Sequence, residues 1–106
     1  MIASGTNSAT LALIKATKGR LFGWNLFNPD SAAAYLQIFD AADVSDVTLG
    51  TTPPTMVLGC GIGAPNTQVP ANLSWDFDNG IVIAATATPT GDGAPGSAMV
   101  FNLNYE

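Results

Sequence analysis

The side chains that could catalyse a reaction or bind a ligand are few in this chain, and most of them are carboxylates. The sequence has eight acidic residues, one cysteine and no histidine. Without histidine, neither a Ser-His nor a Cys-His nucleophile pair can form. Cys60 alone gives neither an intrachain disulfide nor a Cys/His zinc site. The remaining chemistry is that of paired or clustered aspartates.

Two groups of aspartates have spacings that deserve comparison with known sites. Asp40, Asp43 and Asp46 could place three carboxylates around a calcium ion, although the spacing differs from an EF-hand loop and lacks its bidentate glutamate. Asp76 and Asp78 are two residues apart and share one face of a predicted strand, where paired carboxylates would be typical of a glycosidase. Solvated surface carboxylates explain both groups more simply. We therefore expect no metal, no cofactor and no enzymatic activity, with a metal-dependent or glycoside-cleaving enzyme as an alternative to test.

The glycine-rich segment Gly59-Cys-Gly-Ile-Gly63 has some of the composition of a dinucleotide-binding loop. That fingerprint requires a helix directly after the glycines, and Ala64-Pro65-Asn66 does not begin one. A loop or the edge of a sheet is the simpler interpretation. Cys60 within it is expected to be a small buried apolar side chain.

Three aromatic residues offer a second kind of site. Trp24, Trp75 and Tyr35 could stack on sugar rings if they lay exposed on a shallow concave surface. Tryptophan is more often a core or sheet-packing residue. We expect both tryptophans to be in the core, and a carbohydrate-binding face stays the alternative.

Charge is scarce and unevenly placed. Charged residues make up 10% of the chain, against about 25% in an ordinary soluble domain. The three basic residues, Lys15, Lys18 and Arg20, fall within six positions, and no basic residue follows them. Much of the surface must therefore be uncharged or be buried against other chains, which favours an assembly component over a free enzyme.

The net charge of −5 argues against nucleic acid as a partner, because phosphate contacts need well-spread lysine and arginine. The first residues lack the basic and apolar regions of a signal peptide. No apolar run approaches the roughly 20 residues that a membrane helix needs. We expect synthesis in a cytoplasm and no membrane partner.

The pattern of the chain predicts β-structure nearly throughout. Proline and glycine interrupt it at short intervals, and between them apolar residues alternate with polar ones, which favours a sandwich or barrel of short strands. We predict a single all-β domain: an antiparallel, jelly-roll-like β-sandwich of seven or eight strands. The predicted strands are 9–17, 21–28, 33–40, 55–58, 73–77, 80–88 and 98–105. The alternation predicts that Phe22, Trp24 and Leu26 share one face of strand 21–28, and that Leu73, Trp75 and Phe77 of strand 73–77 face inward.

The connections carry further expectations. Asn79-Gly80 is typical of a tight hairpin turn with positive φ. The long connections 43–52 and 59–72 suggest strands that cross between sheets. Residues 1–10 are predicted to be an extended N-terminal arm, and residues 11–106 the β-sandwich.

Several segments, taken together and in order, resemble small virion proteins of tailed bacteriophages, above all the short jelly-roll proteins that decorate or cement the capsid exterior. The resemblance spans about Leu11 to Glu106. The segments are Leu21-Phe-Gly-Trp-Asn-Leu-Phe-Asn-Pro29, Tyr35-Leu-Gln-Ile-Phe-Asp40, the Thr-Pro-Pro of 52–54, Leu73-Ser-Trp-Asp-Phe-Asp-Asn-Gly-Ile-Val-Ile-Ala-Ala-Thr86 and Val100-Phe-Asn-Leu-Asn-Tyr105.

This resemblance implies a structural protein that binds the outer surface of the phage head and stabilises it. It implies a homo-oligomer, most simply a trimer, with the major capsid protein as partner. It also implies synthesis in the host bacterial cytoplasm and a final location on the capsid exterior. The alternative within the same class is a neck, tail or head-fibre protein with a carbohydrate- or host-surface-binding face. No catalytic residue is implied by either.

Five residues are predicted to contact the capsid or a neighbouring copy. Lys15, Lys18 and Arg20 are the basic side chains available to pair with acidic capsid loops. Ile2 and Asn7 belong to the predicted arm, which has no composition for folding alone.

Overall fold

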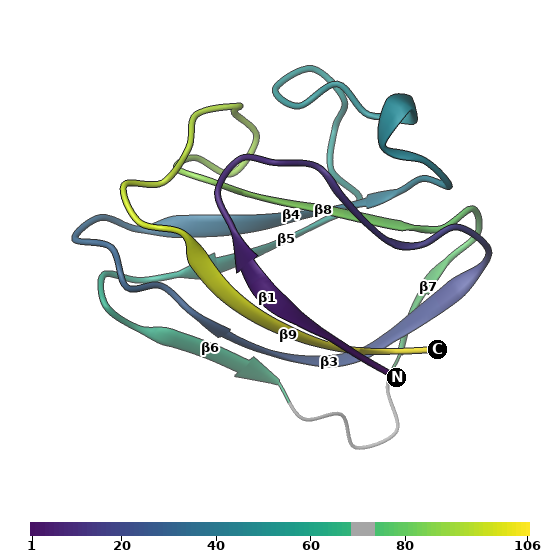
Figure 1. The fold of residues 1–106 in the computed structure, drawn as a ribbon, viewed down its shortest axis with the longest axis horizontal. Helices are drawn as coiled ribbons and strands as arrows, with labels where there is room; N and C mark the ends of the chain where they lie inside the picture. Colours follow the sequence, from purple (N-terminus) through teal and green to yellow (C-terminus); the bar gives the residue numbers. More distant parts are fainter. Residues whose placement is uncertain (69–73) are drawn as a thin grey trace.

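The computed structural model describes residues 1–68 and 74–106, which form two antiparallel sheets packed face to face (Figure 1). Sheet A contains, in order across the sheet, β1 (Ile2–Asn7), β9 (Met99–Tyr105), β3 (Gly19–Phe27) and β6 (Pro65–Gln68), with β7 (Trp75–Phe77) also paired to β3. Sheet B contains β2 (Ala12–Lys15), β8 (Ile81–Thr86), β4 (Ala34–Asp40) and β5 (Met56–Cys60). In this part of the chain the one helical segment is a single 3₁₀ turn, η1 (Val44–Asp46), and no helix is long and apolar enough to cross a membrane.

The strand pairs are nested like the two arms of one long hairpin. The first strand pairs with the last (β1–β9), and β2–β8, β3–β6 and β4–β5 follow inward. Successive pairs fall in alternate sheets, as they do when a hairpin is wrapped into a jelly roll. The predicted all-β, jelly-roll-like sandwich is thus confirmed, with nine strands in the described ranges rather than seven or eight.

Alternating side chains fill the space between the sheets. In β9, Met99, Phe101 and Leu103 are buried in the core, while the residues between them face outward. Trp75 and Phe77 face the core as predicted, and the predicted inward position of Leu73 lies outside the described residues. The buried members of the main core are Leu21, Trp24, Leu26, Ala34, Leu36, Ile38, Leu58, Cys60, Phe77, Ile81, Ile83, Ala85, Met99, Phe101 and Leu103.

A β-bulge changes which face of β3 is buried. Leu21 pairs with Tyr105 but Gly23 with Asn104, so Phe22 is the extra residue in β3. Leu21 and the residues beyond the bulge, Trp24 and Leu26, are buried, whereas Phe22 is only half-buried. The prediction that Phe22, Trp24 and Leu26 share one face is therefore wrong at Phe22, because alternation was assumed to be unbroken.

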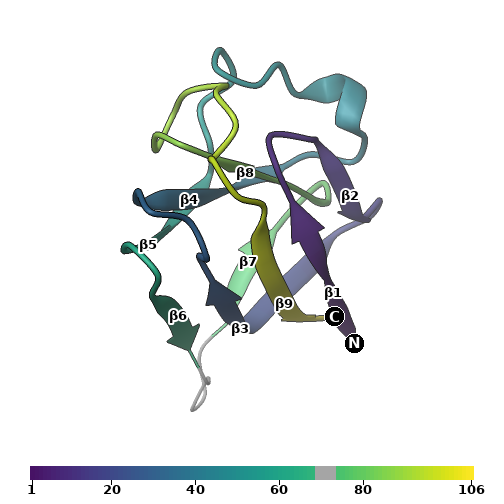
Figure 2. The same cartoon turned by 60° about the vertical axis from the view of Figure 1, so that its left-hand side comes forward.

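Two strands were not predicted, and one of them changes the domain boundary. Residues 1–10 were expected to be an arm outside the sandwich, yet Ile2–Asn7 form β1 and pair without a break along β9 (Figure 2). The predicted strand 9–17 is confined to Ala12–Lys15. β6 is also missing from the prediction, since its sequence Pro-Asn-Thr-Gln shows no apolar alternation.

The segment Asp78–Gly80 does not form a hairpin turn. β7 pairs in sheet A and β8 in sheet B, so these residues carry the chain from one sheet to the other. Positive φ occurs in the described residues at Ala9, Gly50 and Gly63, and not at Asn79 or Gly80. The Asp40 carboxylate holds the corner by accepting the backbone N–H groups of 78, 79 and 80 at 3.2, 2.8 and 3.4 Å.

The outer face of sheet B is covered by loops of the same chain. The connection 43–52 was predicted to cross between sheets, but it joins β4 to β5, which are neighbours in sheet B. It folds over that sheet and closes a second apolar cluster of Phe39, Ala41, Val47 and Val82. The 87–98 loop lies over the same face (Figure 1), where Gly91 O accepts the Gln37 amide at 2.9 Å. The predicted crossing within 59–72 is confirmed by β6 in sheet A.

Candidate interaction face

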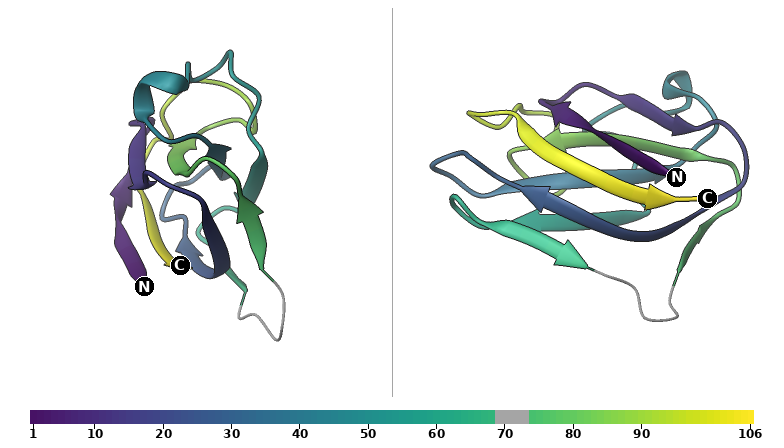
Figure 3. Two further views of the ribbon diagram at one scale, coloured as in Figure 1. Left: turned by 90° about the vertical axis from the view of Figure 1, so that its right-hand side faces the viewer. Right: turned by 60° about the horizontal axis from the view of Figure 1, so that its bottom comes forward.

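The described residues place no such cover over the outer face of sheet A. Figure 3 (right) shows β9, β3, β6 and β1 facing outward with no loop of the described chain in front of them. Three rows of side chains cross this face, and we call them together the outer face of sheet A. The rows are Thr6–Val100–Phe27–Pro65, Ser4–Asn102–Asn25–Thr67 and Ile2–Asn104–Gly23.

None of the side chains in these three rows is charged. Most carry an amide, a hydroxyl or an apolar group, and three large apolar side chains are exposed: Ile2 at 66%, Phe27 at 42% and Val100 at 37%. The Arg20–Asp76 ion pair, at 3.3 Å, lies at the end of the sheet where β7 pairs with β3. A surface of this composition resembles a protein-interface core, which is depleted in charge, more than an ordinary solvated face.

A shallow depression lies in this face over Gly23, which has no side chain to fill it. Its volume is about 270 Å³. Amide side chains and Ile2 form its rim, and the lining residues are Ile2, Gly23, Trp24, Asn25, Thr67, Gln68, Asn102 and Asn104. Within the face, Thr67 donates to Asn25 Oδ1 at 3.1 Å and Asn102 donates to the Asn25 carbonyl at 3.4 Å. Asn104 makes no side-chain hydrogen bond among the described residues, so its amide is free to bind a partner.

The structure brings the three predicted basic residues together, but beside acids. Lys15, Lys18 and Arg20 line one pocket of about 210 Å³, and Glu106 lines it as well. Arg20 Nε lies 3.3 Å from the Asp76 carboxylate, with both side chains more than half exposed. An exposed pair of this kind contributes about 0–1 kcal/mol to stability. This end of the sandwich therefore carries mixed charge and is a weaker match to acidic capsid loops than the sequence suggested.

The two other predicted contact residues separate. Ile2 lies on the outer face of sheet A and is highly exposed. Asn7 is 7% exposed, and its side chain ties β1 to β8: Oδ1 accepts Ala85 N at 2.9 Å, and Nδ2 donates to Thr10 O at 2.7 Å. Asn7 is thus not available to a partner, because its amide serves the fold.

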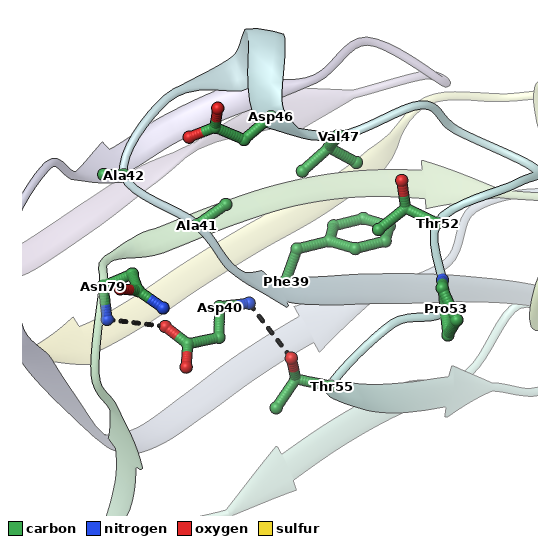
Figure 4. Close-up of a pocket in the computed structure, with 10 residues that line it drawn as sticks. All are labelled: Phe39, Asp40, Ala41, Ala42, Asp46, Val47, Thr52, Pro53, Thr55 and Asn79. Atoms are coloured by element: carbon green, nitrogen blue, oxygen red, sulfur yellow. Dashed lines mark hydrogen bonds between the residues drawn. The ribbon is translucent and has the colours of Figure 1, made fainter.

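The clustered aspartates have local structural roles. The Asp40 carboxylate accepts hydrogen bonds from the backbone of the Asp78–Gly80 corner, and Figure 4 shows it turned toward the backbone of Asn79. Asp43 caps η1 by accepting Ser45 N at 2.9 Å, and this bond lowers the pKa of the Asp43 carboxyl. Asp40 and Asp46 line a pocket of about 320 Å³ (Figure 4). Residues 1–68 and 74–106 contain no group of three or more acidic, histidine or cysteine side chains that could hold a metal ion.

Asp76 of the glycosidase-like pair and Trp24 of the aromatic residues have partners within the fold. Asp76 is paired with Arg20, on the opposite side of β7 from the core. Trp24 is 9% exposed, its Nε1 donates to Asn66 Oδ1 at 3.0 Å, and its ring lies 5.0 Å from that of Trp75. Trp75 and Tyr35 are half-buried. The two tryptophans belong to sheet A and Tyr35 to sheet B, so the three rings do not lie on one sheet.

Cys60 is buried in the main core, as expected, and burial raises the pKa of its thiol. The thiolate is the reactive form, so the native protein is expected to resist alkylating and disulfide reagents. The labelling rate at pH 8 should rise to that of a free thiol only in denaturing urea, which a colorimetric thiol assay measures. Rapid stoichiometric labelling of the native protein would contradict this placement.

Sequence reasoning missed most of the outer face of sheet A. Of its residues only Ile2 was predicted to make contacts. Asn102 and Asn104 did carry a signal, because they alternate with the apolar residues of β9 and so must face outward. Ser4 and Thr6 carried none, since their strand was not recognised. The chain matches no family model, no curated protein and no solved structure.

Proposed function

We propose that this protein is a structural component of a bacteriophage virion, a decoration or cement protein that binds the exterior of the head as a homotrimer. The resemblance of its segments to such proteins suggests the class. The single observation that supports it best is the bare, uncharged outer face of sheet A.

The contrast between the two sheets carries the argument. The chain covers the outer face of sheet B with its own 43–52 and 87–98 segments, which bury Phe39 and Gln37. It leaves the equivalent face of sheet A open, with exposed Ile2, Phe27 and Val100. A partner surface would bury the outer face of sheet A, as the two loops bury the outer face of sheet B.

The composition of the face suits docking on a protein lattice. Burying amides and hydroxyls costs less than burying charges, provided that each finds a hydrogen-bond partner. A closed three-fold ring needs two different surfaces per subunit, because its contacts are heterologous. A ring that binds only the assembled shell stabilises that shell by mass action.

The proposal predicts a specific loss on adding charge to this face. Asn104→Lys places an ammonium group beside the depression over Gly23 in this face but disturbs no hydrogen bond within the described chain, so the fold should be unchanged. The expected result is capsid binding weakened about tenfold or more, since unpaired or like charges in an interface cost several kcal/mol. Co-sedimentation with undecorated capsids measures the binding, and mass photometry of the free protein measures the trimer.

The matched control is Thr90→Lys, which adds the same charge to an exposed position of the 87–98 loop on the other side of the sandwich. Its binding should equal that of the wild type. Equal binding by the Asn104→Lys variant would reject the outer face of sheet A as the docking surface. A wild-type chain that stays monomeric and does not bind capsids would reject the function itself.

A further inference from the structure

The four edges of the two sheets differ in how they are protected from pairing with other strands. β2 carries Lys15 and a register shift, and β6 has only four residues and begins with Pro65. β5 is bridged to sheet A, because Asn66 Nδ2 donates to Gly59 O at 2.8 Å. Charge, proline, shortness and irregular register are the usual means of blocking an edge. Three of the four edges show at least one such device or a covering contact.

β1 shows none of them. It has six residues, no charge and no proline, and its register with β9 runs unbroken from Ile2 to Asn7. It is the outermost strand of sheet A, and among the described residues it pairs with β9 alone. An edge of this kind is a ready template for another strand.

The free hydrogen-bonding groups on this edge can be assigned. Tyr105 N donates to Met1 O at 2.9 Å, so residue 1 faces β9, and by the alternation of an antiparallel pair residues 3, 5 and 7 do so too. The backbone groups of Ile2, Ser4 and Thr6 therefore point away from the sheet. Within residues 1–68 and 74–106 these N–H and C=O groups have no hydrogen-bond partner.

We propose that this edge pairs with β1 of a second copy, antiparallel and centred on Ser4. In that register Ile2 lies opposite Thr6 of the other copy, and Ser4 lies opposite Ser4. The three pairs would exchange about six backbone hydrogen bonds, two for each closely spaced pair. Sheet A then continues across both molecules, and the two uncharged outer faces become one surface.

The properties of this edge favour a second copy of this chain as the partner of β1. The edge is self-complementary in this register, and no charged side chain of β1 meets its own image. The cluster of Lys15, Lys18 and Arg20 lies at the Met1 end, since Glu106 and Arg20 bond each other there. The antiparallel arrangement places the two clusters at opposite ends of the joint. The exposed Ile2 also gains a neighbour across it.

This contact has two-fold symmetry and cannot itself build a three-fold ring. On the shell it would link subunits of adjacent trimers, and only this placement rests on the proposed function. The pairing itself is a property of the purified chain. Free protein should therefore show even-numbered species: dimers, or hexamers where the trimer contact forms as well.

Cysteine cross-linking tests the register. In the proposed pair the two Ser4 Cα atoms are about 5.5 Å apart, a separation that a disulfide spans. Ser4→Cys should give a covalent dimer under mild oxidation on a non-reducing gel, whereas Thr6→Cys, which faces Ile2 of the other copy, should give little. The native Cys60 is present in both variants and is buried, so it should not contribute to the cross-linking. Equal cross-linking of the two variants, or none at either, would overturn the proposal.

Proline tests the hydrogen bonds. Ser4→Pro removes an N–H that does not bond to β9, so the fold should tolerate proline at this edge. Because the same N–H would bond to the second copy, the dissociation constant of the dimer should rise about tenfold or more. Ser4→Ala retains the N–H and should pair like the wild type. Circular dichroism checks folding, and Ser4→Lys, which retains every backbone group, gives a second disruptive variant. Even-numbered species that persist unchanged in Ser4→Pro and Ser4→Lys would refute the pairing. Dimers without capsid binding would instead refute the proposed function.

Discussion

Replacing Phe39 by alanine is expected to lower the free energy of unfolding by about 3–5 kcal/mol, the usual cost of truncating a buried phenylalanine. The Phe39 side chain is 1% exposed and forms the centre of the small cluster with Ala41, Val47 and Val82. This cluster attaches the 43–52 loop to sheet B. Urea unfolding followed by tryptophan fluorescence measures the loss, and part of it should appear as early release of that loop in hydrogen exchange.

Phe27→Ala is the matched control, because it removes the same side chain from the open face of sheet A, where Phe27 is 42% exposed. Its unfolding free energy should fall by only about 1 kcal/mol, in proportion to the smaller area buried. Similar losses in the two variants would show that the 43–52 loop is not held by an apolar cluster.

Gly80→Ala should cost about 3 kcal/mol, although it adds one methyl group. A Cβ at this position would lie 2.5 Å from the Lys15 carbonyl oxygen and even closer to that of Ala41. Both are backbone atoms, one in β2 and the other directly after β4. Overpacking of this kind forces backbone shifts. The shift would also pull the 78–80 amides away from the Asp40 carboxylate. Thermal melting measures the effect as a fall in Tm.

The control for this steric reading is Gly93→Ala, where an added Cβ has no atom within 4 Å and φ is not positive. Alanine there restricts the unfolded chain and should leave stability equal or raise it by about 0.4–1 kcal/mol. If both variants melt alike, the close approach at Gly80 is not what defines the corner between the sheets.

The parts of the fold that could be predicted are those whose pattern is set by the core. β9 alternates between the core and the outside, and β8 is apolar from Ile81 to Ala85, in keeping with the burial of both its faces. These local patterns give the strands, the sandwich and most of the core. The segment that becomes β1 has no apolar face of its own, and its strand state depends on pairing with β9, about a hundred residues away. Sequence periodicity does not report such a dependence.

In the candidate site too, local features could be predicted from the sequence, and features that depend on distant segments could not. The cluster of Lys15, Lys18 and Arg20 is visible in the sequence, but its acidic neighbours Asp76 and Glu106 come from distant parts of the chain. Asn79-Gly80 has the composition of a hairpin turn, yet its role is decided by which sheet accepts each adjoining strand. Cross-strand registers produce the rows of the outer face of sheet A, and they exist only once the sheets are assembled.

The pairing of the first strand with the last has a consequence for the time at which the protein can assemble. β9 lies between β1 and β3 in sheet A, so the centre of this sheet is synthesised after both of its neighbours. At about 5–20 residues per second, β1 waits several seconds or more for its neighbour. Neither the paired edge of β1 nor the outer face of sheet A can form before β9 has been synthesised. Nascent copies are thus kept from joining through these surfaces until that point.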